Sequence, residues 1–150
     1  MSPEGRVRVF GRLQIDEGIV NEIYEDHLGY ATFGVGHLIL ESDPEYGQPI
    51  GTDISPERVA DAFDHDLDIA ISECETLYGA AWFYLPEEVQ EILVNMLFNM
   101  GRPRLTKFKK MNSAIEASDW KTAAVEGRDS RWYNQVGARA ERLMSRLESV

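Results

Sequence analysis

Residues 16–37 read Asp-Glu-Gly-Ile-Val-Asn-Glu-Ile-Tyr-Glu-Asp-His-Leu-Gly-Tyr-Ala-Thr-Phe-Gly-Val-Gly-His. This stretch changes from helix to hairpin: an apolar helical pattern ends at Glu17, before Gly18, and strand-favouring residues interrupted by glycines follow. Asp26 stands in the expected turn, and Thr32 stands in a glycine-rich strand. The carboxylates of Glu17 and Asp26, nine residues apart on the two arms of this junction, can therefore face each other across a gap without touching.

Two carboxyl groups held apart in this way suit the cleavage of a glycosidic bond. One gives a proton to the leaving oxygen, and the other stabilises charge or activates water. Periodicity alone also allows Glu17 to be a solvated acid near a helix end. For the second role Asp26 competes with Glu22 and Glu25, which fit solvated strand-edge positions, and with Asp16, which would point elsewhere on the helix.

Three longer helices are expected around this junction. Ser-Pro-Glu triplets at residues 2–4 and 55–57 each provide a hydroxyl N-cap, a proline for the first turn and an acid for the helix dipole. The second triplet opens an apolar stripe that continues to about Tyr78, where a glycine follows. A third helix is predicted from residue 86 to just before 101, and its wide apolar face places it at the centre of the C-terminal core.

The remaining segments are expected to be short. Residues 22–37 favour strands and turns, and residues 41–53, with two prolines and two glycines, are typical of a loop. The C-terminal part is predicted to hold helices at about 104–117, at about 119–126 with Ser118 as the N-cap, and from about 138 onward.

Charge is distributed unevenly along the chain. Residues 13–101 contain 19 acidic residues and one basic residue, Arg58, whereas residues 102–150 contain 11 basic and 6 acidic residues. The net charge of −11 makes the chain a poor nucleic-acid binder, because affinity for phosphate backbones comes from lysine and arginine. The basic part could still meet an anionic polymer. The alternative is that segregated charge only helps two lobes attract and keeps the protein soluble.

The length and the cysteine count set further limits. The 150 residues suffice for one compact unit, and the single Cys74, in an apolar stripe, excludes an internal disulfide. No apolar run is long enough to span a membrane, and residues 1–6 lack the apolar core of a signal peptide. The sequence therefore predicts no stable membrane association and no export signal of its own.

Three separated sets of motifs resemble those of a known enzyme family. In chain order they are Leu13-Gln-Ile-Asp-Glu-Gly18, Ile23-Tyr-Glu-Asp26, Gly29-Tyr30, Thr32 and Gly34-Val-Gly-His-Leu38; then Phe98-Asn-Met-Gly101, Trp120 and Ala123-Ala-Val125; then Ser130-Arg-Trp-Tyr-Asn-Gln135, Arg139 and Arg142. In these motifs the chain resembles the phage-type lysozymes, glycoside hydrolase family twenty-four. The resemblance covers nearly the whole chain, and three motifs in the right order are hard to obtain by chance.

The resemblance implies an α+β, mostly helical fold, the two-lobed fold of lysozymes, in a single domain of residues 1–150. It places a small β-hairpin lobe at about 13–55 and a long connecting helix at about 56–78. A helical lobe is expected at about 79–150, with the N-terminal helix 3–12 packed on it.

The resemblance also assigns roles to the residues of the junction. Glu17 falls on the position of the catalytic acid, and Asp26 falls on the position of the second carboxylate. Thr32 is often explained in a strand by propensity alone, but in the family its hydroxyl orients the attacking water together with the aspartate. His37 could be a base or a metal ligand by its chemistry, and the family keeps a structural histidine there that supports the active site.

Other positions of the family carry over to the rest of the chain. Leu38 and Phe98 match positions that line the saccharide cleft, and Arg139 matches the arginine that pairs with the catalytic glutamate. Met111 and Glu126 depart from the family at two further cleft positions, which affects subsite preference.

No metal and no organic cofactor is expected. His65 lies among acids on the second helix, where a divalent cation is conceivable, but a solvated acidic face is the simpler interpretation because calcium sites need an oxygen-rich loop. Three histidines and one cysteine offer no ligand set for a zinc amidase.

The activity implied by the resemblance is an inverting muramidase. Such an enzyme hydrolyses the β-1,4 bonds between N-acetylmuramic acid and N-acetylglucosamine in bacterial peptidoglycan. A phage endolysin would accumulate as a monomer in the host cytoplasm and reach the periplasm and cell wall after a holin opens the membrane. Three alternatives stay open: a virion-associated lysozyme, a lytic transglycosylase, and a catalytically silent wall-binding or structural protein.

Overall fold

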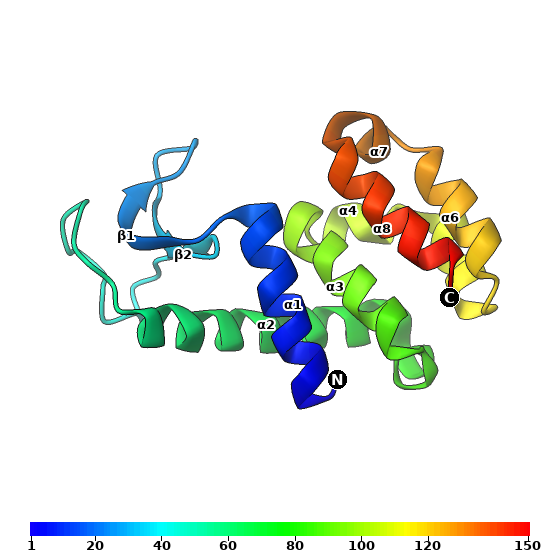
Figure 1. The fold of residues 1–150 in the computed structure, drawn as a ribbon, viewed down its shortest axis with the longest axis horizontal. Helices are drawn as coiled ribbons and strands as arrows, with labels where there is room; N and C mark the ends of the chain where they lie inside the picture. Colours follow the sequence, from blue (N-terminus) through cyan, green and yellow to red (C-terminus); the bar gives the residue numbers. More distant parts are fainter. The chain divides into compact units, whose positions relative to one another are not determined.

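The computed structural model describes residues 1–150 and divides the chain into two compact units. The hairpin unit comprises Val7–Ile69, and the helical unit comprises Met1–Arg6 with Ala70–Val150. All three strands belong to the hairpin unit, whereas the rest of the chain is mostly helical (Figure 1). The predicted α+β fold class is confirmed.

The elements follow one another along the chain as the sequence largely predicts. None of the helices is both long enough and apolar enough to cross a membrane. In order, the elements are α1 (Pro3–Glu17), β1 (Val20–Glu25), β2 (Ala31–Gly34), β3 (His37–Leu38), α2 (Pro56–Tyr78), the 3-10 helix η1 (Gly79–Tyr84), α3 (Glu87–Met100), α4 (Arg102–Thr106), α5 (Lys109–Glu116), α6 (Trp120–Arg128), α7 (Arg131–Val136) and α8 (Ala138–Glu148).

The sheet of the hairpin unit is antiparallel, with the strands in the order β1-β2-β3. Tyr24 of β1 pairs with Thr32 of β2, and Thr32 pairs with Leu38 of β3. Directly paired residues point to the same face of a sheet, so these three side chains form one row across it. Phe33 and His37, the next pair along, point to the opposite face.

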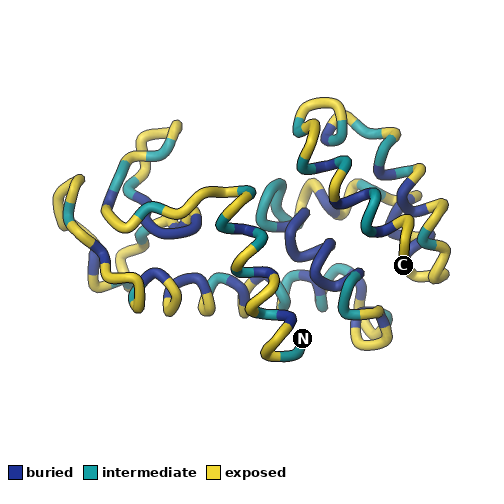
Figure 2. The backbone as a smooth tube through the Cα atoms, viewed as in Figure 1, coloured by how far each residue is buried: buried dark blue, intermediate teal, exposed yellow.

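The face that carries Phe33 is the core side of the hairpin unit. Ile23, Phe33, Ile54, Val59 and Ala62 form a buried apolar cluster, in which the first part of α2 covers the sheet (Figure 2). Alternation along each strand explains the arrangement, because residues next to those of the Tyr24 row must face the core. The face that carries Tyr24, Thr32 and Leu38 is therefore not used in this core.

The segment at 41–53 is a loop, as predicted, and it runs back along β1. The backbone N–H of Ile23 donates to the carbonyl oxygen of Thr52 at 2.9 Å, and the N–H of Gly51 donates to the carbonyl oxygen of Ile23 at 2.7 Å. Glu22 and Asp53 form an isolated antiparallel bridge. These bonds satisfy the backbone groups that β1 would otherwise leave unpaired at the sheet edge.

Helix α3 is the most buried element of the helical unit, which confirms the prediction from its wide apolar face. Every residue from Val89 to Leu97 is buried, including the polar Gln90 and Glu91 (Figure 2). The buried amide of Gln90 donates to the carbonyl oxygen of Trp82 at 2.9 Å, which satisfies it inside the core.

The single helix predicted at 104–117 is wrong. Helix α4 ends at Thr106 and α5 begins at Lys109, because Phe108 leaves the helical conformation with φ −77° and ψ 58°. The ring of Phe108 packs edge-on against Trp132, with the ring centroids 6.0 Å apart. Tertiary packing of this aromatic ring accompanies a break that local propensity does not predict.

The predicted start of the next helix is also wrong. Ser118 does not cap α6 but lies in the left-handed region, with φ 57°. Asp119 takes the capping role, and its carboxylate accepts a hydrogen bond from the N–H of Thr122 at 3.2 Å. Helix α7, capped by Ser130, was not predicted separately.

Candidate active site

Glu17 is the last residue of α1, and it is exposed to solvent. Gly18 follows with φ 79°, a left-handed conformation that glycine adopts without strain and that ends the helix. A negative charge at a helix C-terminus is disfavoured by the helix dipole. The fold therefore holds this carboxylate in a place that helix stability alone would not select.

Asp26 closes the turn between β1 and β2. Its Oδ1 accepts hydrogen bonds from the backbone N–H groups of Leu28 and Tyr30, both at 2.9 Å. Its own backbone N–H donates to the carbonyl oxygen of Tyr30 at 2.9 Å. These bonds fix the orientation of the carboxylate through Oδ1, whereas Oδ2 makes no hydrogen bond within the chain.

Thr32 is buried, and its hydroxyl donates to the carbonyl oxygen of Tyr30 at 3.0 Å. The backbone N–H of Asp26 donates to the same oxygen atom. Two donors that share one acceptor must lie close together, so the fold brings Thr32 next to Asp26. Because the hydroxyl has given its only proton to Tyr30, its lone pairs remain to accept a hydrogen bond.

Tyr24 lies under the influence of both candidate carboxylates. Burial raises the pKa of its phenol above the ordinary value of 10.0, and the negative charges of Asp26 and of Glu17 raise it further. Two carboxylates from different elements therefore act on one phenol within the hairpin unit. Tyr24 was not predicted as a site residue, although its position two residues before Asp26, and opposite Thr32 in the hairpin, was a usable signal.

Leu38 continues the row that contains Tyr24 and Thr32. It is 44% exposed, so β3 presents an apolar side chain on the same face of the sheet. Apolar surface beside polar groups suits the face of a sugar ring, which presents C–H groups on its faces and hydroxyls at its edge.

His37 points to the core side and is nearly completely buried. Its Nδ1 lies 2.7 Å from the carboxylate of Asp66, and its Nε2 lies 3.0 Å from that of Asp43. Burial would lower the pKa of the imidazole, but the hydrogen bonds and charges of Asp66 and Asp43 outweigh burial and raise the pKa above 6.5. Both ring nitrogens are occupied, so neither is available to bind a metal.

Arg58 ties the loop at 41–53 to α2 beside this histidine. Its guanidinium forms two hydrogen bonds of 2.9 Å with the buried Glu45 and one of 3.3 Å with Asp43. It also lies over the ring of Phe33, 5.5 Å from the centroid. The hydrogen bonds and charge of Arg58 lower the pKa of the Glu45 carboxyl against the opposing effect of burial.

Phe98 and Arg139 belong to the helical unit. Phe98 is half-buried near the end of α3. The guanidinium of Arg139 on α8 donates from Nε to Oδ1 of Asn95 at 3.0 Å and from Nη2 to the Asn95 carbonyl oxygen at 3.3 Å. These bonds fix the position of Arg139, and its pairing with Glu17 stays a prediction.

Acidic side chains near His65 do not form a metal site. A cavity of about 510 Å³ in the hairpin unit is lined by His65 with Asp61, Asp64 and Asp68 among other residues. No group of three or more His, Cys, Asp or Glu side chains is arranged to hold a metal ion.

Comparison with known proteins identifies the family. The family model for phage lysozymes matches residues 14–149. The pre-baseplate central spike protein Gp5 of Enterobacteria phage T4 is 32% identical over 148 residues, which cover 87% of this chain and 26% of the spike protein. Probable T4-type lysozyme 2 of Dictyostelium discoideum is 31% identical over 155 residues, which cover 91% of each chain. The peptidoglycan hydrolase gp36 of Pseudomonas phage phiKMV is 28% identical over 131 residues, which cover 87% of this chain and 14% of that hydrolase. Because the family model and the T4-type lysozyme match nearly the full length, this chain belongs to the phage lysozyme family.

Proposed function

We propose that this chain is a muramidase that hydrolyses the β-1,4 bond between N-acetylmuramic acid and N-acetylglucosamine in bacterial peptidoglycan, with inversion at the anomeric carbon. Membership of the phage lysozyme family makes it a lysozyme, that is, a glycoside hydrolase that cleaves peptidoglycan. The choice of bond and the stereochemistry follow the resemblance to the phage-type lysozymes, and the hydrogen bonds of Asp26 and Thr32 support the residue roles.

The observation that carries the proposal is the pattern of hydrogen bonds around Asp26 and Thr32. Oδ1 of Asp26 is held by two backbone N–H groups, and the Thr32 proton is given to Tyr30. A water between the two side chains would donate one proton to Oδ2 of Asp26 and one to Oγ1 of Thr32. Its lone pairs would then be free to attack the anomeric carbon, and Asp26 would take the proton that the water loses.

Glu17 is proposed as the proton donor to the glycosidic oxygen. It comes from a different element than Asp26, and the effect of both charges on Tyr24 supports a site that the two carboxylates share. An inverting enzyme must leave room for the water between the second carboxylate and the sugar. The two carboxyl groups are therefore expected about 6.5–9.5 Å apart, rather than the roughly 5 Å of retaining enzymes.

The other site residues are proposed to bind and support. Leu38 and Phe98 would contact the sugar rings, since both offer apolar surface. Arg139, fixed by Asn95, would pair with Glu17 before the substrate displaces or desolvates that contact. His37 would support the site from the core side, through its bonds to Asp66 and Asp43.

The proposed biological role is that of a phage endolysin. The protein would act as a monomer that collects in the host cytoplasm and reaches the wall through a holin-dependent lesion. A virion-associated lysozyme is the second candidate, because one relative of the chain is the pre-baseplate central spike protein of phage T4. Mass spectrometry of purified particles separates the two roles, since only the second requires the chain in the virion.

The activity is tested by product analysis of digested peptidoglycan. Wild type is expected to release fragments with reducing N-acetylmuramic acid ends that first appear as the α-anomer in NMR spectra. Glu17→Gln should lower kcat by about 10²–10⁴-fold, the usual share of a general acid. Glu25→Gln, a change of an exposed acid on β1, is the matched control and should keep full activity. Products ending in 1,6-anhydromuramic acid would replace the proposal by a lytic transglycosylase.

A further inference from the structure

Tyr24 lies directly opposite Thr32 in the antiparallel pairing of β1 with β2 (Figure 1). Directly paired side chains of such a sheet lie on the same face, with Cβ atoms about 4.5–5.5 Å apart. Asp26 follows Tyr24 by two residues, and its N–H continues the ladder to the carbonyl oxygen of Tyr30. Residues two apart along an extended chain face the same side. The ring of Tyr24 therefore lies on the face that carries Asp26 and Thr32, the pair proposed to bind the water.

A β-bulge in β1 sets this pairing. Val20 pairs with Gly34 and Tyr24 pairs with Thr32, so β1 advances from 20 to 24 while β2 runs only from 34 to 32, and the register shifts between the two pairs. Without the shift, Tyr24 would not stand opposite Thr32. The loop at 41–53 forms hydrogen bonds with the bulged part of β1, which satisfies backbone groups that the shift withdraws from β2. Bulges beside active sites commonly redirect a side chain in this way.

The side chain of Thr32 is covered, although its face of the sheet is not the core face. Thr32 is 4% exposed, whereas Leu38, its direct partner on the other side, is 44% exposed. Neighbours on that face must cover the threonine, and Tyr24 carries the larger of the two paired side chains. The ring of Tyr24 therefore closes the β1 side of the position between Thr32 and Asp26.

The ring presents an uncharged surface to this position. Burial raises the pKa of the Tyr24 phenol, and the charges of Asp26 and Glu17 raise it further, so the phenol is neutral at neutral pH. Its hydroxyl makes no hydrogen bond within the chain. The face of the ring offers no lone pair to a water, so a water beside it directs its two protons to the oxygen atoms of Asp26 and Thr32.

We propose that Tyr24 is a positioning residue whose ring encloses the attacking water between Asp26 and Thr32, an inference that rests on the proposed function. The two side chains accept the two protons of the water, and the ring closes the β1 side. One water then fits in one orientation, with a lone pair toward the anomeric carbon. The same enclosure excludes a larger nucleophile. Tyr24 thus acts on the reaction through the water.

The first test compares water with methanol as the nucleophile. In dilute methanol, Tyr24→Ala should release α-methyl glycosides of N-acetylmuramic acid beside the usual reducing ends, because the space left by the ring accommodates the methyl group. In that step the methanol oxygen bonds to the anomeric carbon, its hydroxyl proton passes to Asp26, and Glu17 protonates the departing oxygen. Wild type and Tyr24→Phe, which both keep the ring, should release reducing ends only. Mass spectrometry and NMR of the fragments measure the ratio of products.

The second test measures the rates of the same variants in water. Tyr24→Ala should lower kcat by on the order of 10²-fold with little change in KM, because a water that is free to move is seldom aligned. Tyr24→Phe should keep most of the rate, because the lost hydroxyl makes no hydrogen bond in the protein. Tyr84→Ala, which removes an 87% exposed tyrosine of η1, is the control and should change neither rate nor products. A loss of stability alone would lower the rate without changing the ratio of products.

The outcomes separate this inference from the muramidase proposal. Reducing ends alone from Tyr24→Ala in methanol, or an equal share of methyl glycosides from wild type, would overturn the inference while the muramidase proposal stands. A rate of Tyr24→Phe as low as that of Tyr24→Ala would do the same. Products of wild type that end in 1,6-anhydromuramic acid would refute the muramidase proposal and, with it, any role for an attacking water.

Two further measurements do not depend on the folding of Tyr24→Ala. If that variant does not fold, Tyr24→Val, which keeps a strand-favouring side chain, replaces it with the same expected products. In the wild-type protein, NMR should show contacts between the ring protons of Tyr24 and the methyl group of Thr32. Their absence would overturn the inference whatever the protein hydrolyses.

Discussion

His37 should make the stability of the hairpin unit depend on pH, and His37→Gln should remove that dependence. The imidazolium forms two charge-assisted hydrogen bonds, to Asp66 at 2.7 Å and to Asp43 at 3.0 Å. The glutamine amide has one nitrogen, so it can replace only one of these two donors, and it carries no positive charge. A hydrogen bond to a charged group contributes about 1.5–3 kcal/mol, so the loss of one such bond sets the size of the effect. The two carboxylates are 25% and 16% exposed, so screening is limited, and the substitution should cost about 2 kcal/mol near pH 5.5.

The sign of the pH effect follows from the direction of each shift. The pKa of His37 is raised in the folded protein, so its contribution is complete below about pH 6.5 and is lost as the pH rises through the folded pKa. The pKa of Asp43 is lowered: burial opposes the shift, but the N–H of Leu40 and the charge of His37 outweigh burial. Its contribution is therefore present above about pH 3.8 and is lost as the pH falls through the folded pKa.

Urea unfolding and calorimetry at pH 5.5, 7 and 9 measure this effect. Wild type should lose about 2 kcal/mol between pH 5.5 and the pH at which His37 is neutral, or about 4–8 °C in Tm for a chain of this size. His37→Gln should show a much flatter profile over the same range. Equal pH dependence in the two proteins would refute the reasoning, and so would a wild type that becomes more stable above pH 7. His65→Gln, on the exposed face of α2, is the control for the loss of a histidine that makes no such bonds.

Four further outcomes are expected. Arg58→Gln should lower the free energy of unfolding by about 2–4 kcal/mol, because it leaves the buried carboxylate of Glu45 without its bidentate partner; chemical denaturation measures this loss. Thr32→Val should lower kcat on peptidoglycan by about 10–100-fold while Thr32→Ser keeps most activity, and equal rates for the two variants would exclude a role for the hydroxyl. Gly34→Ala should destabilise the protein by about 1–3 kcal/mol, because φ is 66° and the new methyl would lie 3.1 Å from a valine side chain. The thiol of Cys74, whose pKa burial raises to about 12, should not react with Ellman's reagent at pH 8 until the protein unfolds in urea.

The regular elements of the fold were predictable because their sequence signals are local. The Ser-Pro-Glu triplets mark the starts of α1 and α2, and in both the serine hydroxyl accepts a hydrogen bond from a backbone N–H of the first turn. Glycines at 18 and 79 follow the last residues of these helices. Hydrophobic periodicity identified α3 and its burial.

The break at Phe108 and the cap of α6 were not predictable in the same way. The propensities of residues 104–117 favour one helix, and only the packing of Phe108 on Trp132 accompanies its division. Ser118 and Asp119 are both good N-cap residues, but Ser118 lies in the left-handed region with φ 57°, whereas Asp119 has φ −97° and ψ 80° and caps the helix. Long-range packing accompanies the break at Phe108. The left-handed conformation of Ser118 accompanies local bonds that end α5, from the N–H groups of Ser118 and Asp119 to the carbonyl oxygens of Ile115 and Ala114.

In the candidate site, too, the sequence predicts the residues but not their hydrogen bonds. Spacing and resemblance point to Glu17, Asp26 and Thr32, but they do not say how these side chains are bonded. The single carbonyl oxygen of Tyr30, which accepts from both Asp26 and Thr32, determines which atoms are left for a water. That detail depends on the geometry of one turn, which a sequence pattern describes only as a turn.

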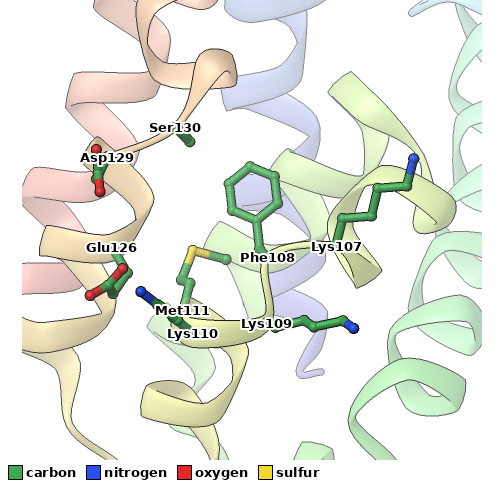
Figure 3. A pocket seen from close by; sticks show the side chains of 8 residues that line it. All are labelled: Lys107, Phe108, Lys109, Lys110, Met111, Glu126, Asp129 and Ser130. Atoms are coloured by element: carbon green, nitrogen blue, oxygen red, sulfur yellow. The ribbon is translucent and has the colours of Figure 1, made fainter.

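For the basic residues of the C-terminal part, the position of each charge in the fold matters more than the number of charges. Residues 102–150 contain 11 basic residues, and the sequence alone does not show which of them are paired inside the protein. In the structure Arg128 and Arg146 are each held by carboxylates on other helices, so they stabilise packing and are not available for binding. The ammonium groups of Lys107, Lys109 and Lys110, which line the cavity shown in Figure 3, make no hydrogen bond or ion pair within the chain. Charges without an internal partner can recognise a ligand without first breaking an internal bond, so the basic segment offers fewer binding charges than its composition suggests.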